Sequence, residues 1–440
     1  MQQQAWVVAI DMGYGHQRAA FPLRHLSPNG KVLLANNYAG IPKNDRRIWI
    51  NSQKFYELFS RAKNVPIIGD WIFDVLIDKM QRINPFYPKR DQSAPNLQLK
   101  MNYSGIKRGW GKDLVNYLNK KNIPLITTFF TVAFMAEEHG FKNDIYCVVC
   151  DSDISRAWAP LNPRKSRIKY LTPCRRATER LKYYGVREEN IFLAGFPLPQ
   201  ENLGNGDIAV LKSDLSDRIV NLDPERRYRQ KYFGTIKKFL NTVHAKEQHK
   251  HPLTLTFAVG GAGAQKNIGA DLIKSLHKKI SHDEIKLNLI AGTREDVYFY
   301  FKNCIKRNGL SQNENIKVIF EPDKEEYFTA LNKVLRGTDI LWTKPSELVF
   351  YCALGLPIIM SPPLGSQEMF NKTWLKTVGA GISQQDPKLA HEWIFDWVKS
   401  GWLAEAAMSG FLDGRQFGVQ NITNIVFNGA KAPAEDYQLV

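Results

Sequence analysis

Residues Leu253-Thr-Leu-Thr-Phe-Ala-Val-Gly-Gly-Ala-Gly263 join an apolar, strand-like run to a glycine-rich turn, and a helical pattern follows near 265–280. Strand and helix patterns continue to alternate from there to about residue 385. This alternation is typical of a parallel, doubly wound α/β sheet. Strands are expected at Leu253–Val259, Ile285–Ala291, Val318–Glu321, Asp339–Trp342 and Pro357–Ser361.

The first half of the chain shows the same pattern less cleanly, with strands expected at Ala5–Asp11, Lys31–Ala35, Pro124–Phe130, Ile145–Asp151 and Ile168–Thr172. The sequence therefore predicts two Rossmann-like domains that face a cleft, because ligands of such sheets bind at the carboxyl ends of the strands. The expected boundaries are an N-terminal domain at 1–200, a helical interdomain connection at 201–250, a C-terminal domain at 251–385 and C-terminal helices packing across the domains at 386–440.

The composition is that of a soluble globular protein of 440 residues, 44% hydrophobic and 23% charged. No apolar run approaches the ~20 residues that span a bilayer, and the N-terminus lacks the basic region of a signal peptide. Five scattered cysteines suit a reducing compartment, so a cytoplasmic location is expected. A net charge of +17 attracts polyanions, but no nucleic-acid recognition motif accompanies it, and nucleic acid is not an expected partner.

Two glycine-containing turns are candidate ligand sites. In Ala258-Val-Gly-Gly-Ala-Gly263 the glycines let backbone N–H groups approach a phosphate, although the sequence also suits a plain tight turn. It lacks the Lys-Ser/Thr pair of a P-loop, which argues against an ordinary NTPase. In Asp11-Met-Gly-Tyr-Gly-His16 the histidine stands at a helix start, where it would either take a proton from a hydroxyl or merely cap the helix.

Polar residues follow two later strands, at Thr343, Lys344, Ser346 and Glu347 and again at Gln367, Glu368 and Asn371. A carboxylate at such a sheet edge can hold a ribose diol, and hydroxyl and amide groups can hold a diphosphate. Taken one at a time, these residues could equally cap helices, as Ser346 and Gln367 would do well.

Taken in order, the motifs resemble those of GT-B glycosyltransferases, in the group of monogalactosyldiacylglycerol synthase, processive diacylglycerol glucosyltransferases and, more distantly, the peptidoglycan lipid-intermediate N-acetylglucosaminyltransferase. The resemblance covers about 5–200 and 253–385. The similar segments are Gly13–His16 (family Gly-x-Gly-His), Cys150–Trp158 (Thr-Asp-Phe-x-x-His-x-x-Trp), Gly185–Pro197 (Gly-Val … Gly-x-Pro), Gly260–Gly263 (Gly-Gly-x-Gly), Thr343–Pro345 (Thr-Lys-Pro) and Gly355–Asn371 (Gly-Leu-Pro … Gly-Gln-Glu-x-x-Asn).

The resemblance implies transfer of a sugar from a UDP-sugar to an acceptor hydroxyl, for which a lipid is one candidate, with inversion and without a metal or other cofactor. It implies His16 as general base, with Asp11 or Asp153 orienting it, and an acceptor-side loop of Gly13, Gly15, Asp151 and Trp158. The C-terminal domain would hold the donor through Gly260, Gly261, Ala262, Gly263, Thr343, Lys344, Ser346, Glu347, Gln367, Glu368 and Asn371.

Two positions depart from the family pattern. Ser155 stands where the family has a histidine, and Glu347 lies about one helical turn before the family's ribose-binding glutamate, so Glu368 competes for that role. These departures are the features that would favour an alternative, a non-catalytic protein that binds a nucleotide sugar or another polyanion. A nucleotide-sugar epimerase of the same fold is a further alternative, because fold does not determine chemistry.

Two weaker signals concern metal and membrane. Asp151-Ser-Asp153 matches the Asp-x-Asp metal pattern of a different transferase fold, but after a strand of this kind a cleft-lining or capping pair is expected instead. Between residues 46 and 112, aromatic and aliphatic residues are interleaved with basic ones. An amphipathic surface with basic rims docks on anionic bilayers, so a peripheral membrane association is a candidate, and an ordinary pair of core helices is the alternative.

Overall fold

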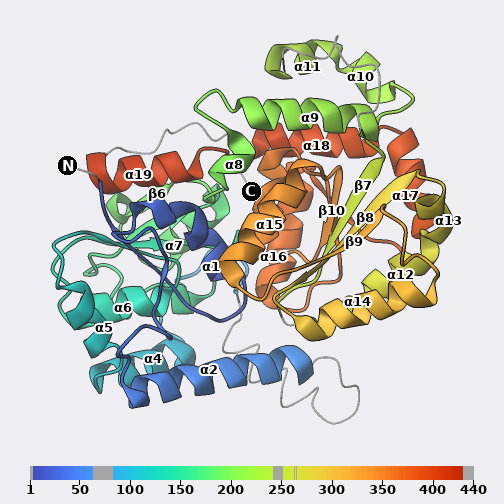
Figure 1. The fold of residues 1–440 in the computed structure, drawn as a ribbon. Coiled ribbons are helices and arrows are strands. Elements are labelled where there is room, and N and C mark those ends of the chain that lie inside the picture. The colour runs from blue at the N-terminus through green and yellow to red at the C-terminus, as the bar shows by residue number, and fades with distance from the viewer. Residues whose placement is uncertain (1–2, 63–82, 241–250, 262, 264, 430–440) are drawn as a thin grey trace. The chain divides into compact units, whose positions relative to one another are not determined.

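The computed structural model describes residues 3–62, 83–240, 251–261, 263 and 265–429, which form two compact units (Figure 1). Unit 1 consists of the residues up to 198, residues 364–371 and the residues from 417 onward. Unit 2 consists of residues 199–363 and 372–416.

Unit 1 is built on a parallel sheet whose six described strands follow the order β2-β1-β3-β4-β5-β6. The strands are β1 (Trp6–Ala9), β2 (Leu33–Leu34), β3 (Leu125–Thr127), β4 (Ile145–Val148), β5 (Lys169–Thr172) and β6 (Ile191–Leu193). The helices are α1 (Gly15–Ala20), η1 (Phe21–Leu26), α2 (Lys43–Ala62), α4 (Leu97–Lys107), α5 (Lys112–Leu118), α6 (Phe130–Glu138), η2 (Arg156–Trp158), α7 (Arg175–Tyr183), η3 (Glu188–Asn190) and α19 (Gly418–Asn428).

The core of unit 1 includes a helix from the far end of the sequence. Val7 of β1 and Ile126 of β3 pack in one buried cluster with Val419, Ile422 and Ile425 of α19. Fully burying an aliphatic side chain of this size contributes about 1.5–3 kcal/mol. This apolar stripe explains why the residues from 417 onward belong to unit 1 rather than to the unit that precedes them in the chain.

Unit 2 contains a second parallel sheet, with six strands among its described residues in the order β12-β11-β10-β7-β8-β9. They are β7 (Leu253–Ala258), β8 (Ile285–Gly292), β9 (Ile316–Phe320), β10 (Ile340–Thr343), β11 (Ile358–Met360) and β12 (Gly381–Ser383). The helices are α8 (Gln200–Leu203), α9 (Ala209–Leu222), α10 (Arg227–Lys231), α11 (Phe233–Leu240), α12 (Lys266–Ser275), α13 (His277–Ser281), α14 (Glu295–Arg307), α15 (Lys324–Arg336), η4 (Glu347–Leu354), η5 (Pro387–Leu389), α17 (Ala390–Lys399) and α18 (Trp402–Asp413).

A buried arginine holds α9 against the rest of unit 2. The guanidinium of Arg218, only 2% exposed, donates to the carbonyl oxygens of Thr338 (2.7 Å), Leu354 (2.8 Å) and Gly355 (3.0 Å). The last carbonyls of a helix lack partners within that helix, and a cation near them is favourable. Arg218 therefore caps the ends of α15 and η4, and α9 lies beside α18 in the same unit (Figure 1).

The expected α/β class, with two Rossmann-like parallel sheets, is confirmed. All ten strands expected from the sequence are present with bounds that differ by up to a few residues, and two further strands, β6 and β12, lie at sheet edges. The expected helix near 346–354 is the 3-10 helix η4. Helix α16 (Ser366–Val378) begins in unit 1 and continues into unit 2 at residue 372. Among the described residues, no helix is both long and apolar enough to cross a membrane.

Candidate functional site

Each sheet has one switch point, where successive strands are added toward opposite edges. In unit 1 the strands β2 and β3 flank β1, and in unit 2 the strands β8 and β10 flank β7. Open α/β sheets bind ligands beyond the carboxyl ends of the strands at such points. The loops after β1 and β3 in unit 1, and after β7 and β10 in unit 2, are therefore the candidate sites.

The loop after β1 is held by a network around Asp11. The backbone N–H of Asp11 donates to Asn36 Oδ1 (2.8 Å), and Asn36 Nδ2 donates back to the Asp11 carbonyl oxygen (3.2 Å). Gln17 Nε2 donates to the Asp11 carboxylate (3.0 Å). Gly13 has φ +81°, a conformation that costs glycine little, and Gly15 begins α1. The Asp11 carboxylate thus holds Gln17, the residue that follows His16 in α1.

His16 is oriented by the loop after β3. Its Nδ1 lies 2.7 Å from the carbonyl oxygen of Thr128. A carbonyl oxygen only accepts, so Nδ1 carries the hydrogen and the neutral ring has its lone pair on Nε2. The ring packs edge-on against Phe129, with centroids 4.9 Å apart, and lies 6.3 Å from the indole of Trp158. His16 therefore has the tautomer that a general base acting through Nε2 requires.

The Asp153 carboxylate contacts two arginines of α7. The carboxylate is completely buried and accepts hydrogen bonds from Arg176 Nε (2.8 Å), Arg180 Nε (2.7 Å) and the second Arg180 nitrogen, Nη2 (2.9 Å). The backbone N–H of Ile154 donates to it as well (2.9 Å). These contacts attach α7 to the loop after β4, so Asp153 is a structural anchor of unit 1.

The rest of the acceptor-side loop meets Asn371. Asn371 Nδ2 donates to Asp151 Oδ1 (2.9 Å), and the backbone N–H of Ser152 donates to Asn371 Oδ1 (2.8 Å). Trp158 is buried, and its carbonyl oxygen accepts from the Tyr170 hydroxyl (2.8 Å). The structure therefore brings Asn371, expected among the donor-binding residues, together with the acceptor-side loop in unit 1.

In unit 2 the glycine-rich loop follows β7. Gly260, Gly261 and Gly263 are described, whereas Ala262 lies outside the described residues. An added Cβ at Gly260 would lie 2.5 Å from Lys344 Cε, so the lysine side chain crosses this glycine at van der Waals distance. A Cβ at this position would therefore displace the end of the Lys344 side chain. Both residues stand at the switch point.

The loop after β10 carries the other residues expected at the donor. The Thr343 hydroxyl donates to the Ala258 carbonyl oxygen (3.3 Å) and so spans the two central strands. Ser346 precedes η4 without a side-chain capping bond, contrary to the simple capping alternative. Glu347 begins η4 and is only 8% exposed. Glu347 thus lies in the same loop as Lys344, one strand away from the glycine-rich loop.

Gln367 and Glu368 lie in the part of α16 that belongs to unit 1. A Glu368 carboxylate oxygen accepts from the backbone N–H of Leu364 (2.7 Å), which closes the turn before the helix. Gln367 Oε1 accepts from the Ser366 hydroxyl (3.5 Å). Glu368 therefore has a local role in the turn.

Sequence reasoning did not find three residues that build these sites: Thr128, Phe129 and Arg176. Thr128 and Phe129 follow β3, in the polar-then-aromatic run Thr127-Thr-Phe-Phe130. Arg176 stands in the first turn of α7 with its guanidinium carbon 4.9 Å from the Phe86 ring and 5.0 Å from the Phe370 ring. The change from apolar to polar residues after β3 was the available signal for Thr128, whereas no local pattern marks Arg176.

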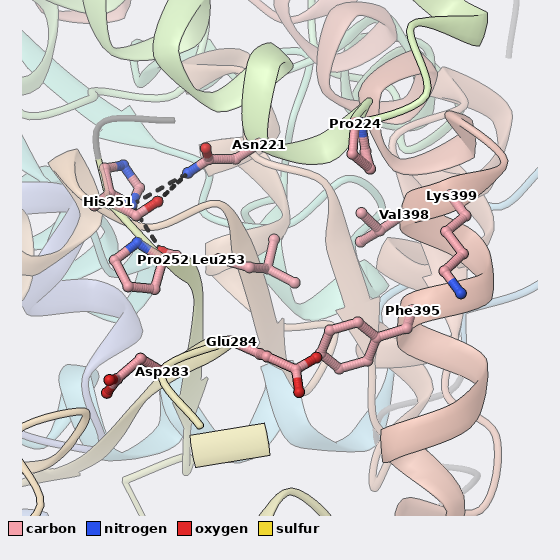
Figure 2. A pocket seen from close by; sticks show the side chains of 10 residues that line it. All are labelled: Asn221, Pro224, His251, Pro252, Leu253, Asp283, Glu284, Phe395, Val398 and Lys399. Atoms are coloured by element: carbon pink, nitrogen blue, oxygen red, sulfur yellow. Dashed lines mark hydrogen bonds between the residues drawn. The ribbon is translucent and has the colours of Figure 1, made fainter. Parts of the chain in front are cut away.

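A cavity of about 480 Å³ lies in unit 2 at the amino ends of the strands of the second sheet (Figure 2). Its wall includes Leu253, the first residue of β7, and Glu284, which precedes β8, together with Phe395 of α17. The amino ends of the strands therefore border this cavity, whereas the glycine-rich loop follows their carboxyl ends. The cavity is not part of the candidate donor site.

A buried polar network lies beside this cavity. Asp339 accepts from Asn221 Nδ2 (3.0 Å) and from the backbone N–H of Thr254 (2.8 Å), and His251 Nδ1 lies 3.7 Å from the same carboxylate oxygen. Figure 2 shows His251 and Asn221 joined at the rim. Burial raises the pKa of Asp339 to about 6.

Comparison with known proteins gives one family match and several similar folds. The profile of a family described as "Domain of unknown function (DUF6938)" matches residues 235–321. No curated protein sequence matches the chain. Solved structures similar to the chain include Acinetobacter baumannii MurG, with 14% identity, a TM-score of 0.44, and 96% of this chain and 98% of that chain covered. S. aureus MnaA with UDP has 11% identity and a TM-score of 0.47, with both chains covered to 100%. A glycosyltransferase from Rickettsia africae ESF-5 has 10% identity and a TM-score of 0.42, with 97% of this chain and 100% of that chain covered.

The two doubly wound sheets define the class of the protein. Each sheet is parallel, six-stranded within the described residues and covered by helices, which is the two-domain Rossmann-like architecture of the GT-B fold. Fold alone does not assign a reaction, so the assignment of an activity depends on the residues at the two switch points.

Proposed function

We propose that the protein is a glycosyltransferase that moves a sugar from a UDP-sugar to an acceptor hydroxyl, with unit 2 binding the donor and unit 1 supplying the base. The observation that carries this proposal is the 2.7 Å contact between His16 Nδ1 and the Thr128 carbonyl oxygen. It supports a base with a fixed tautomer at the switch point of the first sheet. The choice of UDP rests on the resemblance of the sequence motifs.

In the proposed reaction His16 Nε2 takes the proton of the acceptor hydroxyl as its oxygen attacks the anomeric carbon. The bond from that carbon to the diphosphate breaks on the opposite face, UDP leaves with the electron pair, and the anomeric centre is inverted. Positioned donors stabilise such a leaving group most effectively when they are preorganised. In unit 2 these donors would be the Lys344 ammonium and the backbone amide of Gly261, because the Gly263 amide already donates to the Gly260 carbonyl oxygen (2.8 Å).

The remaining candidates have narrower roles in this proposal. Asp11 would position His16 through Gln17, and Thr343 and Glu347 would contact the nucleotide or sugar from the loop after β10. Asn371 would fix the acceptor-side loop through Asp151. Asp153 is left out of the reaction because its carboxylate is engaged by two arginines.

We also propose a lipid acceptor reached from an anionic membrane. Ile50 of α2 and Leu97 and Met101 of α4 are exposed apolar residues, the last two by 60% and 59%. The exposed Arg46 and Arg47 precede Ile50 on α2. Apolar residues with basic neighbours suit an anionic bilayer surface. Trp49 is instead buried against Trp110, as the core-helix alternative expects, and residues 63–82 of this stretch lie outside the described residues.

The test is to incubate the purified protein with a panel of UDP-sugars, with and without lipid vesicles, and to identify every nucleotide product. Release of UDP that depends on an acceptor supports the proposal. Appearance of an isomeric UDP-sugar without acceptor would identify an epimerase instead. Binding of UDP without any product from wild-type protein would identify a non-catalytic binding protein, and the absence of UDP binding would remove the donor assignment altogether.

A further inference from the structure

Helix α7 in unit 1 begins without the usual stabilising groups at its amino end. Cys174 occupies the N-cap position without a side-chain capping bond, and the first turn contains no acidic residue. Arg175 and Arg176 occupy that turn instead. The free N–H groups and the positive end of the helix dipole favour an anion and disfavour cations. Two arginines at this position are therefore unfavourable unless an anion joins them.

The carboxylates nearby do not balance this positive charge fully. Asp153 is shared between Arg176 and Arg180, and both guanidinium groups donate to it. Asp151, the other acidic residue of the loop after β4, accepts from Asn371. Arg175 is half-buried and makes no hydrogen bond or ion pair with any described residue. Because one of the three guanidinium groups lacks a carboxylate, an excess of positive charge remains at the start of α7.

Ser152 supplies an independent observation beside this helix end. It is 0% exposed, and its hydroxyl oxygen has no hydrogen-bond partner within the part of the chain that the structure describes. Its backbone is fully used: the N–H donates to Asn371 Oδ1 (2.8 Å), and the carbonyl oxygen accepts from the Cys174 thiol (3.4 Å). A buried hydroxyl without a partner is costly and rare. The contact between its carbonyl oxygen and the Cys174 thiol places Ser152 beside the N-cap residue of α7.

We propose that the start of α7 is a binding site for a phosphate group, formed by Arg175, Arg176, the hydroxyl of Ser152 and the N-terminal amides of the helix. A phosphate accepts several hydrogen bonds at once and carries the charge that two arginines match. The site lies beyond the carboxyl ends of β4 and β5, and His16 lies beyond those of β1 and β3. Two strand spacings separate the two positions, which is ~10 Å along one sheet edge.

The phosphate has two sources that fit this chemistry, a soluble phosphate ester or a phospholipid headgroup at a membrane surface. The proposal concerns unit 1 alone and does not depend on the donor site of unit 2. Both sources would present the same charged group to the same residues, so the test uses inorganic phosphate, glycerol phosphate and vesicles containing phosphatidylglycerol as separate probes.

The experiment measures the thermal midpoint of the full chain in inorganic phosphate against chloride at equal ionic strength, with UDP present to occupy the other phosphate-binding loop. A chloride sample without UDP gives the shift that UDP itself causes. Phosphate is expected to raise the midpoint of the wild type by a few degrees. Arg175→Gln and Ser152→Ala should abolish this shift. Lys182→Gln, which removes the same charge from the last turn of α7, should retain it.

The outcomes separate the two proposals of this structure. No phosphate shift in the wild type, or an equal shift in Arg175→Gln, would overturn the phosphate site whatever UDP does. A phosphate shift that depends on Arg175 without any UDP shift would leave this site standing and overturn the donor assignment. Glycerol phosphate acting as strongly as vesicles would point to a soluble ester, and retention on phosphatidylglycerol vesicles that is lost in Arg175→Gln would point to a headgroup. Ser152→Ala should fold normally without ligand, because it removes an unpaired polar atom.

Discussion

The Nδ1 atom of His16 lies 2.7 Å from the carbonyl oxygen of Thr128, which stands 112 positions later in the chain. The Thr128 hydroxyl donates in turn to the carbonyl oxygen of His16 (2.9 Å). This reciprocal pair joins the loop after β1 to the loop after β3 across the switch point of unit 1. The imidazole is thereby held in one orientation and one tautomer, as general-base catalysis demands.

Replacing His16 with alanine should lower kcat by roughly 10²–10⁴-fold, the usual contribution of a positioned acid or base. The affinity for UDP should stay within about twofold, because unit 2 supplies the donor contacts in the proposal. Steady-state kinetics and calorimetric UDP titration measure the two effects. His25→Ala is the matched control, since His25 Nδ1 also contacts a carbonyl oxygen of its own unit, that of Pro22 (3.0 Å). If His16→Ala turned over as fast as His25→Ala, His16 would not be the general base.

Gly260→Ala should weaken UDP binding by displacing Lys344. The added Cβ would lie 2.5 Å from Lys344 Cε, closer than carbon atoms approach, so the lysine must move away from the loop. Loss of a charge-assisted contact of about 1.5–3 kcal/mol corresponds to roughly 10–150-fold in affinity. Lys344→Gln should lose a comparable amount.

The double variant distinguishes displacement of the lysine from damage to the loop. If Gly260 acts through Lys344, the two substitutions together should weaken UDP binding no more than Lys344→Gln alone. Fully additive losses would show that Gly260 contributes separately, through the loop backbone itself. Gly309→Ala is a suitable control in unit 2, because a Cβ there would meet no atom within 4 Å, although its φ of +70° adds some backbone strain.

The sequence predicted the two sheets because their central strands are buried on both faces and read as apolar runs between helical patterns. It missed β6 and β12 for a physical reason. Both are three residues long and lie at a sheet edge, where one neighbouring strand is enough and a long apolar run is unnecessary. The sequence also did not indicate that η4 is a 3-10 helix, because its apolar residues suit an α-helix as well as a 3-10 helix.

The places of some candidate residues in the fold could be predicted from local sequence, whereas the contacts of others depend on distant partners. The positions of His16 and Gly260 follow from strand–turn–helix patterns, and both stand at switch points. The partners of Asn371 and Asp153 could not be read from sequence. Asn371 contacts a residue 220 positions away in the chain, and no local pattern indicates that contact.

Asp153→Ala should destabilise the protein by about 3–5 kcal/mol, the usual cost of removing one partner of a buried ion pair. Arg180 is 0% exposed and would be left without its carboxylate. Asp144→Ala is the control, since Asp144 pairs with Lys169 at the surface and its loss should cost less than about 1 kcal/mol. Denaturant unfolding measures both variants.

Turnover tests whether Asp153 also acts in the reaction. The folded fraction of Asp153→Ala should retain kcat within about threefold and an unchanged pH–rate profile, because its carboxylate serves α7. A loss near 100-fold at full stability would instead make Asp153 the orienting partner of His16. Adding Arg180→Met to Asp153→Ala should recover part of the lost stability, because it removes the unpaired buried charge.

Asp339 should make the protein less stable as pH rises from about 4 to 6. Burial raises its pKa to about 6 in the folded state, with His251 and Arg218 acting in the opposite direction. Between the ordinary value of 3.8 and this raised value, the folded carboxyl holds a proton that the unfolded chain has lost. The unfolding free energy therefore falls through this window and levels off above it.

Asp339→Asn isolates this contribution from those of the other acidic residues. The asparagine oxygen can still accept from the backbone N–H of Thr254, so the fold should be retained. Measured midpoints should fall more steeply between pH 4 and 6 in the wild type than in Asp339→Asn, by an amount equivalent to roughly 1–3 kcal/mol. The variant removes the cost of a buried charge at neutral pH, so its relative stability should be highest there. Parallel curves across the window would mean that Asp339 is already ionised at its ordinary pKa.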